Sequence, residues 1–279
     1  MLSEYCLIEA EARAVVDSRS TGGARGVPRV EGGKRILVVG ASGDMGRAVL
    51  QMLARSRAKV GAHYNKSTTL KRQVQNGRIG NSKVKLYAAD LSTQKNCHAL
   101  VDAFVEWAGG IDVLIQLSGN ISRPISWEAL SQEDWLADLN VNLSGPFFLS
   151  QRAMFYMMKA GRGRILLTST ASAKHGGGKN SMAYGVAKAG IECLVKGLAR
   201  EGAPHGILVN AIAPGFIATQ FHSKRMGRDR GALEQRAALV PLKRAGRPGD
   251  VAGLILYLLS SGGSFITGEC ISVSGGDWL

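Results

Sequence analysis

A tyrosine and a lysine four residues apart form the pair in this chain that is best suited to proton transfer. Tyr184 and Lys188 lie on a predicted helix over residues 182–202, where four-residue spacing places both side chains on one face. A free tyrosine, with a pKa of about 10, exchanges protons poorly at neutral pH. Because a nearby ammonium stabilises the phenolate, we expect the pKa of Tyr184 to be lowered. The alternative is an ordinary amphipathic helix, on which the ring packs and the amine is solvated.

A glycine-rich turn upstream of this pair predicts a phosphate-binding site. A buried strand is expected to end at residue 39, and the glycine-rich stretch 40–46 leads from it into a helix expected over 45–54. Glycines let the backbone approach a pyrophosphate closely, and the N–H groups at a helix start attract negative charge. A second strand, expected over 59–64, completes the context of a dinucleotide site. A plain strand-to-helix turn is the alternative.

From about Lys34 to its C-terminus, the chain resembles the short-chain dehydrogenases/reductases. Besides the two features above, the resemblance rests on a strand end at 164–170, an asparagine motif at 140–143, a proline-glycine motif at 210–215 and a closing stretch at 267–276. It implies an α/β fold of the Rossmann type, doubly wound, with a mainly parallel sheet of about seven strands and helices on both faces.

The resemblance implies hydride transfer between a nicotinamide and a carbonyl or secondary alcohol carbon. Tyr184 is then expected to supply or remove the proton on the substrate oxygen, and Thr170 to orient that oxygen. Lys188 is expected to hold the nicotinamide ribose hydroxyls and to tune Tyr184, and Asn142 to anchor a water in a proton relay.

Three departures from the family pattern bear on this assignment. Asp44 stands where a second glycine is usual, and we expect its carboxylate to point away from the pyrophosphate. Residues 116–119 read Gln-Leu-Ser-Gly instead of two asparagines, an alanine and a glycine, which we interpret as a change in stability. Thr170 replaces a serine, which keeps the hydroxyl but adds a methyl group. Ser172 and then Ser169 are alternative sources of the hydroxyl.

The end of the second strand bears on the choice of nicotinamide. No acid is present there to bind the 2′-hydroxyl of NAD, whereas Lys66, with its two neighbours, can bind a 2′-phosphate, so NADP is favoured over NAD. Lys66 as a solvated charge is the alternative. Asp90 is expected beside the adenine, or else as a helix cap. The expected cofactor-binding residues are Gly40, Ser42, Gly43, Met45, Gly46, Asn65, Lys66, Ser67, Asp90, Leu91, Gly119, Tyr184, Lys188, Pro214, Gly215, Ile217 and Thr219.

Length and composition agree with one enzyme domain. The 279 residues, 20% of them charged, suit a single α/β unit, which we place at 34–279 after a flexible extension at 1–33. The apolar stretches are too short to span a membrane, and Glu4, Glu9 and Glu11 interrupt any secretory signal, so we expect a cytoplasmic protein. The four cysteines and five histidines have no metal-binding spacing, and we expect no metal ion and no disulfide.

The net charge of +14 raises the question of nucleic acid, because residues 45–89 hold ten Lys and Arg and no acid. That charge is diffuse and accompanied by no nucleic-acid-binding motif, so we expect an anionic cofactor and an anionic substrate instead. A second basic cluster, 222–230, is expected to recognise a carboxylate, a phosphate, coenzyme A or an acyl carrier protein, or else to be a solvated loop. Further pocket candidates are Arg123, Trp127, His175, Lys179 and Asn180.

The sequence therefore favours an NADP-preferring oxidoreductase that acts on a small carbonyl or alcohol, with 3-oxoacyl and sugar or polyol substrates left open. By resemblance, helices near 131–160 and 182–202 carry the site and a subunit interface, and a homotetramer is expected, with a dimer second. The alternative is a non-catalytic nucleotide sensor or scaffold of the same fold. Asp44 and the altered stretch 116–119 favour this alternative.

Overall fold

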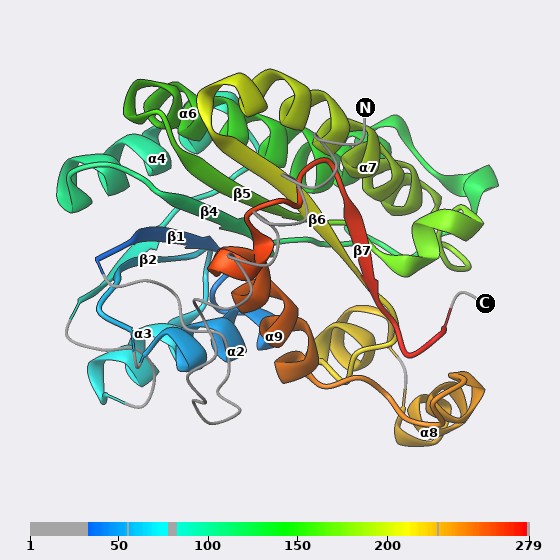
Figure 1. The fold of residues 1–279 in the computed structure, drawn as a ribbon. Helices are drawn as coiled ribbons and strands as arrows, with labels where there is room; N and C mark the ends of the chain where they lie inside the picture. The colour runs from blue at the N-terminus through cyan, green and yellow to red at the C-terminus, as the bar shows by residue number, and fades with distance from the viewer. Residues whose placement is uncertain (1–32, 55, 78–82, 228, 278–279) are drawn as a thin grey trace, which may run out of the picture.

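The computed structural model describes residues 33–54, 56–77, 83–227 and 229–277, and their strands form one parallel sheet. The predicted extension 1–33 lies, apart from Gly33, outside the described residues. The sheet has seven strands in the order β3-β2-β1-β4-β5-β6-β7, which confirms the predicted Rossmann-type fold (Figure 1). The strands are β1 (Arg35–Val39), β2 (Lys59–Tyr64), β3 (Val84–Ala88), β4 (Val113–Gln116), β5 (Gly163–Thr168), β6 (Ile207–Pro214) and β7 (Cys270–Val273).

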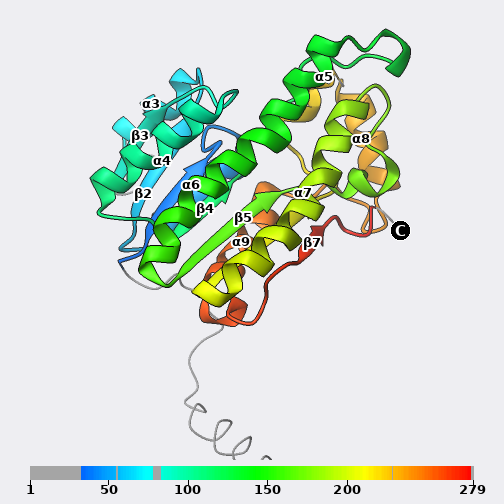
Figure 2. The ribbon, with the colours of Figure 1, turned by 90° about the horizontal axis from the view of Figure 1, so that it is seen from above.

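Helices cover both faces of the sheet, as Figures 1 and 2 show. One face packs against α2 (Asp44–Leu53), α3 (Thr68–Gln75) and α9 (Pro248–Leu259), and the other against α4 (Gln94–Ala108), α6 (Gly145–Ala160) and α7 (Met182–Gly202). Each face has its own apolar cluster, so the strands are buried on both sides. Continuous apolar runs such as Ile36 to Val39, all fully buried, are typical of such strands.

The remaining elements are short and lie mostly at the ends of the strands. They comprise α5 (Gln132–Leu139), α8 (Arg230–Leu239), two π-helical turns and four 3-10 turns. The π-helical turns are η2 (Asn140–Ser144) and η5 (Phe221–Arg225). The 3-10 turns are η1 (Trp127–Ala129), η3 (Ala171–His175), η4 (Ala203–His205) and η6 (Ser261–Gly263).

The predicted helix near 131–160 contains an interruption that its sequence pattern does not announce. Helix α5 continues through the π-helical turn η2 into α6. A π-turn holds one more residue than an α-turn and is frequent at functional sites. The extra residue here falls around Asn142, which is fully buried.

Among the described residues, every helix is too short or too polar to cross a bilayer.

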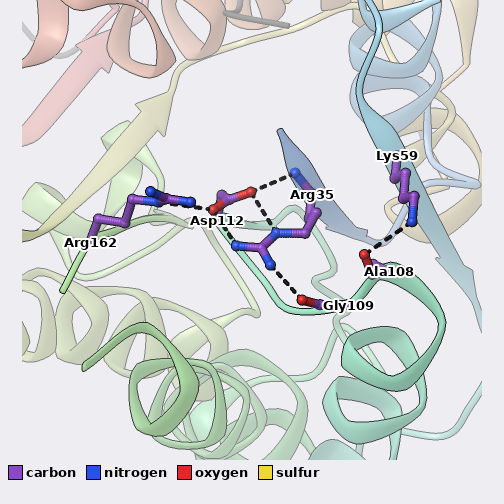
Figure 3. Close-up of polar contacts among 6 residues, drawn as sticks. All are labelled: Arg35, Lys59, Ala108, Gly109, Asp112 and Arg162. Carbon is purple, nitrogen blue, oxygen red and sulfur yellow. Dashed lines mark hydrogen bonds and ion pairs between the residues drawn. The ribbon is translucent and has the colours of Figure 1, made fainter. Parts of the chain in front are cut away.

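An ion pair holds the amino ends of the central strands together at the edge opposite the predicted site (Figure 3). The Arg35 guanidinium donates to both Asp112 carboxylate oxygens, at 2.8 and 2.7 Å, and Nη1 donates to the Gly109 carbonyl at 2.6 Å. Arg162 approaches the same carboxylate at 3.4 Å. Burial alone would raise the pKa of Asp112, but the hydrogen bonds from Arg35 outweigh it and lower that pKa to about 2.

We predict that Asp112→Asn lowers the free energy of unfolding by about 2–3 kcal/mol, because Arg35 loses its charged partner in a buried setting. The carboxylate contribution is complete above the unfolded pKa of about 4 and disappears as pH falls through the folded value. Denaturant unfolding at pH 7 and at pH 3 measures both effects: the difference between mutant and wild type should be about halved at pH 3, which lies between the unfolded and folded pKa values, and it should vanish only below about pH 2. Arg162→Ala is the control, with a loss below about 1 kcal/mol, since that side chain is mostly exposed.

Candidate active site

The predicted site residues gather at one edge of the sheet because every strand is parallel. Strand β1 lies between β2 and β4, and the chain winds in opposite directions on its two sides. Ligands of such sheets bind outside the carboxyl ends of the strands at this reversal. The predicted catalytic and cofactor-binding residues follow the carboxyl ends of β1 to β6 or lie on helices beside them.

The glycine turn after β1 has the geometry that a pyrophosphate requires. Gly40 has a φ of +78°, and a Cβ there would lie 2.5 Å from the Ser118 backbone nitrogen. A Cβ on Gly46 would collide with the Gly40 carbonyl oxygen. Gly43 is the N-cap of α2, and no side chain caps the N-terminus of this helix. The close backbone approach and the uncapped helix start therefore fit the diphosphate of a dinucleotide.

A buried histidine, which the sequence analysis did not single out, holds this turn in place. His63, in β2, accepts a hydrogen bond on Nδ1 from the Gly40 N–H at 3.2 Å, and its Nε2 lies 3.0 Å from the Ala89 carbonyl oxygen. Burial lowers the pKa of His63, against the smaller raising effect of the Ala89 carbonyl. The neutral ring that burial favours can accept at Nδ1 while donating at Nε2. His63 thus links β2 and β3 to the glycine turn.

Asp44, the acid in the glycine turn, has both carboxylate oxygens engaged. One oxygen pairs with the Arg47 guanidinium, one turn along α2, and the other accepts a hydrogen bond from the Gln220 backbone N–H at 2.7 Å. Arg47 also donates to the Ser42 carbonyl at 2.7 Å. The carboxylate is therefore directed toward the segment after β6, which is compatible with the expected orientation away from the pyrophosphate.

The altered stretch after β4 is supported within its own loop. Gln116 is fully buried, and its Nε2 donates to the Ser118 carbonyl and hydroxyl oxygens at 3.0 and 2.7 Å. Its Oε1 is buried and has no hydrogen-bond partner among the described residues. The link to the neighbouring strand comes instead from the Thr168 hydroxyl, which donates to the Gln116 backbone carbonyl at 2.6 Å. One buried acceptor thus remains unsatisfied, which costs stability.

Tyr184 and Lys188 lie on one face of α7, whose bounds match the predicted helix. The Lys188 ammonium lies 5.7 Å from the centroid of the Tyr184 ring and donates to the Thr168 carbonyl at 2.8 Å. Only 1% of Lys188 is exposed. A Cβ on Gly119 would lie 3.4 Å from the Lys188 Nζ and 3.2 Å from the Asn142 Oδ1, so these side chains converge on Gly119. The absence of a Cβ leaves room beside the lysine.

The expectation that the pKa of Tyr184 is lowered is wrong for this structure. Burial raises it, the Asp138 carboxylate raises it further, and only a hydrogen bond with Thr170 acts to lower it. Burial also lowers the pKa of Lys188 to about 7, because desolvation disfavours the ammonium. The lysine is consequently only partly charged at neutral pH and provides little of the expected stabilisation, while its hydrogen bond goes to Thr168.

The three candidate hydroxyl groups after β5 point to different places. The Thr170 side chain hydrogen-bonds with Tyr184 and lies 3.1 Å, oxygen to oxygen, from the Ser172 hydroxyl. The Ser169 hydroxyl is buried and donates to the Lys188 carbonyl at 2.9 Å and to Glu192 Oε1 at 3.0 Å. The structure therefore brings Thr170 to the phenol, with Ser172 beside it, whereas Ser169 faces α7.

Asn142, in the π-helical turn, braces the segment that follows β4. Its side-chain amide donates to the Asn120 carbonyl at 2.6 Å and to the Asp138 carbonyl at 2.9 Å, and its Oδ1 accepts from the Asn120 N–H at 3.1 Å. The same helix contributes Asp138, a buried acid that the sequence analysis missed. One Asp138 oxygen accepts from both the backbone N–H and the hydroxyl of Ser122, each at 2.7 Å.

The predicted adenosine-side residues lie after β2 and β3. Lys66 and Asn65 are exposed, and Ser67 is the N-cap of α3 without a side-chain cap, so a cation stands next to an uncapped helix start. Asp90 accepts a hydrogen bond from the Ser92 N–H at 3.0 Å. Its alternative role as a helix cap is wrong. Thr93 caps α4 by accepting from the Asn96 N–H. Leu91 is buried, so only its backbone is available to a ligand.

The stretch after β6, from which the nicotinamide-side residues are predicted, begins at Pro214. A Cβ on Gly215 would lie 2.7 Å from the Ser274 Cβ, so only glycine fits there. Ile217 is buried and pairs with Gly246 in an isolated bridge. Thr219 lines a cavity of about 450 Å³ together with Asp44. Pro214 ends β6, and its carbonyl oxygen lies 3.4 Å from the Thr170 hydroxyl.

The further pocket candidates are less well supported. Arg123 is paired with Asp134 at 2.9 Å, and 67% of Trp127 is exposed. Asn180 has a φ of +59°, and its carbonyl accepts from the Ile125 N–H at 3.0 Å, which gives it a backbone role. His175 ends the turn η3, and Lys179 is exposed. Among the described residues, no three His, Cys, Asp or Glu side chains are grouped to hold a metal ion.

Comparisons with known proteins agree on one family. A family model described as enoyl-(acyl carrier protein) reductase matches residues 40–277. The chain is 34% identical over 244 residues to 3-oxoacyl-[acyl-carrier-protein] reductase FabG of Thermotoga maritima, an alignment that covers 88% of this chain and 97% of that protein. It is 31% identical over 250 residues to acetoacetyl-CoA reductase of Acinetobacter sp., with 88% and 98% covered.

Two solved structures are similar to this chain in fold over most of its length. The structure of a levodione reductase aligns with a TM-score of 0.81 and 25% identity, covering 88% of this chain and 98% of that one. A second structure, gox2181, aligns with a TM-score of 0.80 and 27% identity. The fold, the family match across most of the chain and relatives above 30% identity over nearly their whole length place this chain in the short-chain dehydrogenase/reductase family of oxidoreductases.

Proposed function

We propose that this chain is an NADP-preferring oxidoreductase of a small carbonyl or secondary alcohol, in which Tyr184 handles the proton on the substrate oxygen. The observation that carries this proposal is that Tyr184 has both Thr170 and Lys188 beside it, and that Lys188 in turn adjoins Gly119, at the sheet edge where the glycine turn fits a pyrophosphate. A bound nicotinamide supplies or accepts the hydride. Family membership and relatives named as reductases stand against the scaffold alternative.

The protonation states favour carbonyl reduction as the direction of the proposed reaction. Burial keeps the Tyr184 phenol protonated at neutral pH, so the proton that a carbonyl oxygen must receive is present on it, although the raised pKa makes the phenol a weaker acid than a free tyrosine. We assign the Thr170 hydroxyl, which interacts with the Tyr184 phenol, to bind the same oxygen. Lys188, with a pKa of about 7, is able to gain or lose a proton near neutral pH and so to return a proton toward Tyr184. The Asn142 side chain hydrogen-bonds with the Asn120 backbone and so holds the segment after β4 near Tyr184 and Lys188.

The comparisons favour a 3-oxoacyl thioester over a sugar or polyol as the substrate class, because two of the relatives are named for reducing such thioesters. An anionic carrier agrees with the net charge of +14. The predicted basic cluster 222–230 lies only partly within the described residues. Within it, Arg230 forms an ion pair with Glu234 at 2.8 Å, which neutralises part of its charge.

We predict that Tyr184→Phe lowers kcat by about 10²–10⁴-fold, because the only change is the loss of the proton donor. The dissociation constant for NADPH should stay within about twofold, measured by fluorescence titration, since the ring still packs near Phe221. Tyr257→Phe on the exposed face of α9 is the matched control and should leave both values unchanged. Retained turnover in Tyr184→Phe would remove Tyr184 from the proposed mechanism.

We predict that Lys66→Ala weakens NADPH binding about tenfold or more and leaves NADH binding unchanged, because only NADPH carries the 2′-phosphate that the ammonium would bind. Calorimetry at fixed salt measures both constants. Lys71→Ala, an exposed lysine on the adjoining helix α3, is the control for a general loss of positive charge. Equal weakening of both cofactors, or of neither, would contradict the NADP preference.

We predict a homotetramer in solution, as two separate apolar faces are exposed in the single chain. One lies on α5, α6 and α7 and includes Leu136, Phe155 and Val186, and the other includes Tyr257 and Phe265. We assign each group to a two-fold subunit interface, and two such interfaces build a tetramer with dihedral symmetry. Light scattering after gel filtration measures the mass, and a monomer would contradict the prediction. Phe155→Glu should reduce the assembly to a dimer.

A further inference from the structure

We propose that Asp44 is a positioning residue that ties the glycine turn to the segment after β6 (residues 215–225, here the covering segment), whose Phe221 ring packs near Tyr184, and that its charge weakens dinucleotide binding while doing so. The proposal rests on the proposed function for its second half only. The contact itself links the first residue of α2 to Gln220, 176 positions later, through the 2.7 Å hydrogen bond from the Gln220 N–H to Asp44 Oδ2.

The contact leads directly to the catalytic tyrosine. Gln220 immediately precedes η5, whose first residue, Phe221, has its ring centroid 6.0 Å from that of Tyr184. The next residue, His222, packs against both neighbours, with its ring centroid 5.6 Å from that of Phe221 and 4.8 Å from that of Phe216. A shift of the Gln220 backbone would therefore move the ring that lies against the phenol. Holding Gln220 on α2 fixes the position of Phe221.

Helix capping does not explain the geometry of Asp44. Gly43 is the N-cap of α2, and no side chain caps that helix start. The Asp44 carboxylate is only partly exposed, at 18%, and its two oxygens go to Arg47 and to Gln220 instead. Arg47 in turn donates to the Ser42 carbonyl. The carboxylate thus joins the glycine turn, α2 and the covering segment through one residue.

The position of this charge has a consequence for the cofactor. Asp44 adjoins the uncapped helix start that fits a pyrophosphate, and a carboxylate there repels a second anion. Pairing with Arg47 reduces the repulsion without removing it. Replacing Asp44 by glycine should therefore have two opposite effects. The cofactor should bind more tightly, whereas the covering segment should loosen and the substrate should bind less well.

The first test is hydrogen exchange of the Gln220 amide in the protein without cofactor, so that it does not depend on activity. In the wild type this amide should be protected. In Asp44→Gly its exchange should be at least about tenfold faster, because its acceptor is gone. Asp44→Asn keeps an oxygen that can accept the bond, and most of the protection should remain. Glu234→Gln, a charge removal in the same cavity, is the matched control and should change nothing.

The second test compares NADPH affinity with the substrate KM. Both Asp44→Gly and Asp44→Asn should bind NADPH about three- to tenfold more tightly at low salt, with the gain shrinking as salt rises. Only Asp44→Gly should raise the substrate KM. Gln220→Pro removes the donor, and the φ of −63° at Gln220 suits proline. It should raise KM and leave the NADPH affinity unchanged.

The outcomes separate this proposal from the proposed function. Unchanged exchange of the Gln220 amide in Asp44→Gly would overturn the contact. Faster exchange with unchanged NADPH affinity and KM would overturn its role in binding and leave a purely structural contact. A wild-type protein that binds neither NADPH nor NADH would overturn the proposed function, while the exchange result would still decide whether Asp44 holds the covering segment.

Discussion

Parallel strands end at a common edge, and this constraint is the one on which the site depends. Seven strands in one direction bring the segments after β1, β2, β3, β4, β5 and β6 together, although they are far apart in the chain. Each crossover then needs a helix on one face or the other, which buries the strands on both sides. The Arg35–Asp112 ion pair stabilises the opposite edge and involves none of the predicted site residues.

Burial shifts the pKa of an ionisable group toward its neutral form, and a charged hydrogen-bond partner can reverse that shift. Burial raises the pKa of Tyr184 and lowers those of Lys188 and His63, because none of the three has enough opposite charge beside it. Asp112 is buried as well, yet its pKa is lowered because Arg35 supplies charged hydrogen bonds. At the proposed site, burial thus leaves a protonated phenol beside a lysine whose pKa is lowered to about 7.

Departures from the family pattern are accommodated by contacts that cross the fold. Asp44 replaces a glycine, and its carboxylate is taken up by Arg47 and by the backbone of Gln220. Gln116 replaces an asparagine, and it supports its own loop while Thr168 makes the link between strands. The contact between Asp44 and the Gln220 backbone thereby joins the glycine turn to the segment after β6.

Local patterns in the sequence were sufficient for several of the elements and for the glycine turn. The bounds of β2 and α7 agree with the predicted ones, and the glycine spacing predicted the turn, because these features depend on periodicity and on backbone freedom within a few residues. The tertiary structure alone decided the pKa of Tyr184, the choice of Thr170 over Ser169 as the hydroxyl facing it, the π-turn at Asn142, and the contacts of His63, Asp138 and Asp44. Each of these depends on burial or on a partner distant in the chain, and desolvation and long-range hydrogen bonds leave no periodic signal in a sequence.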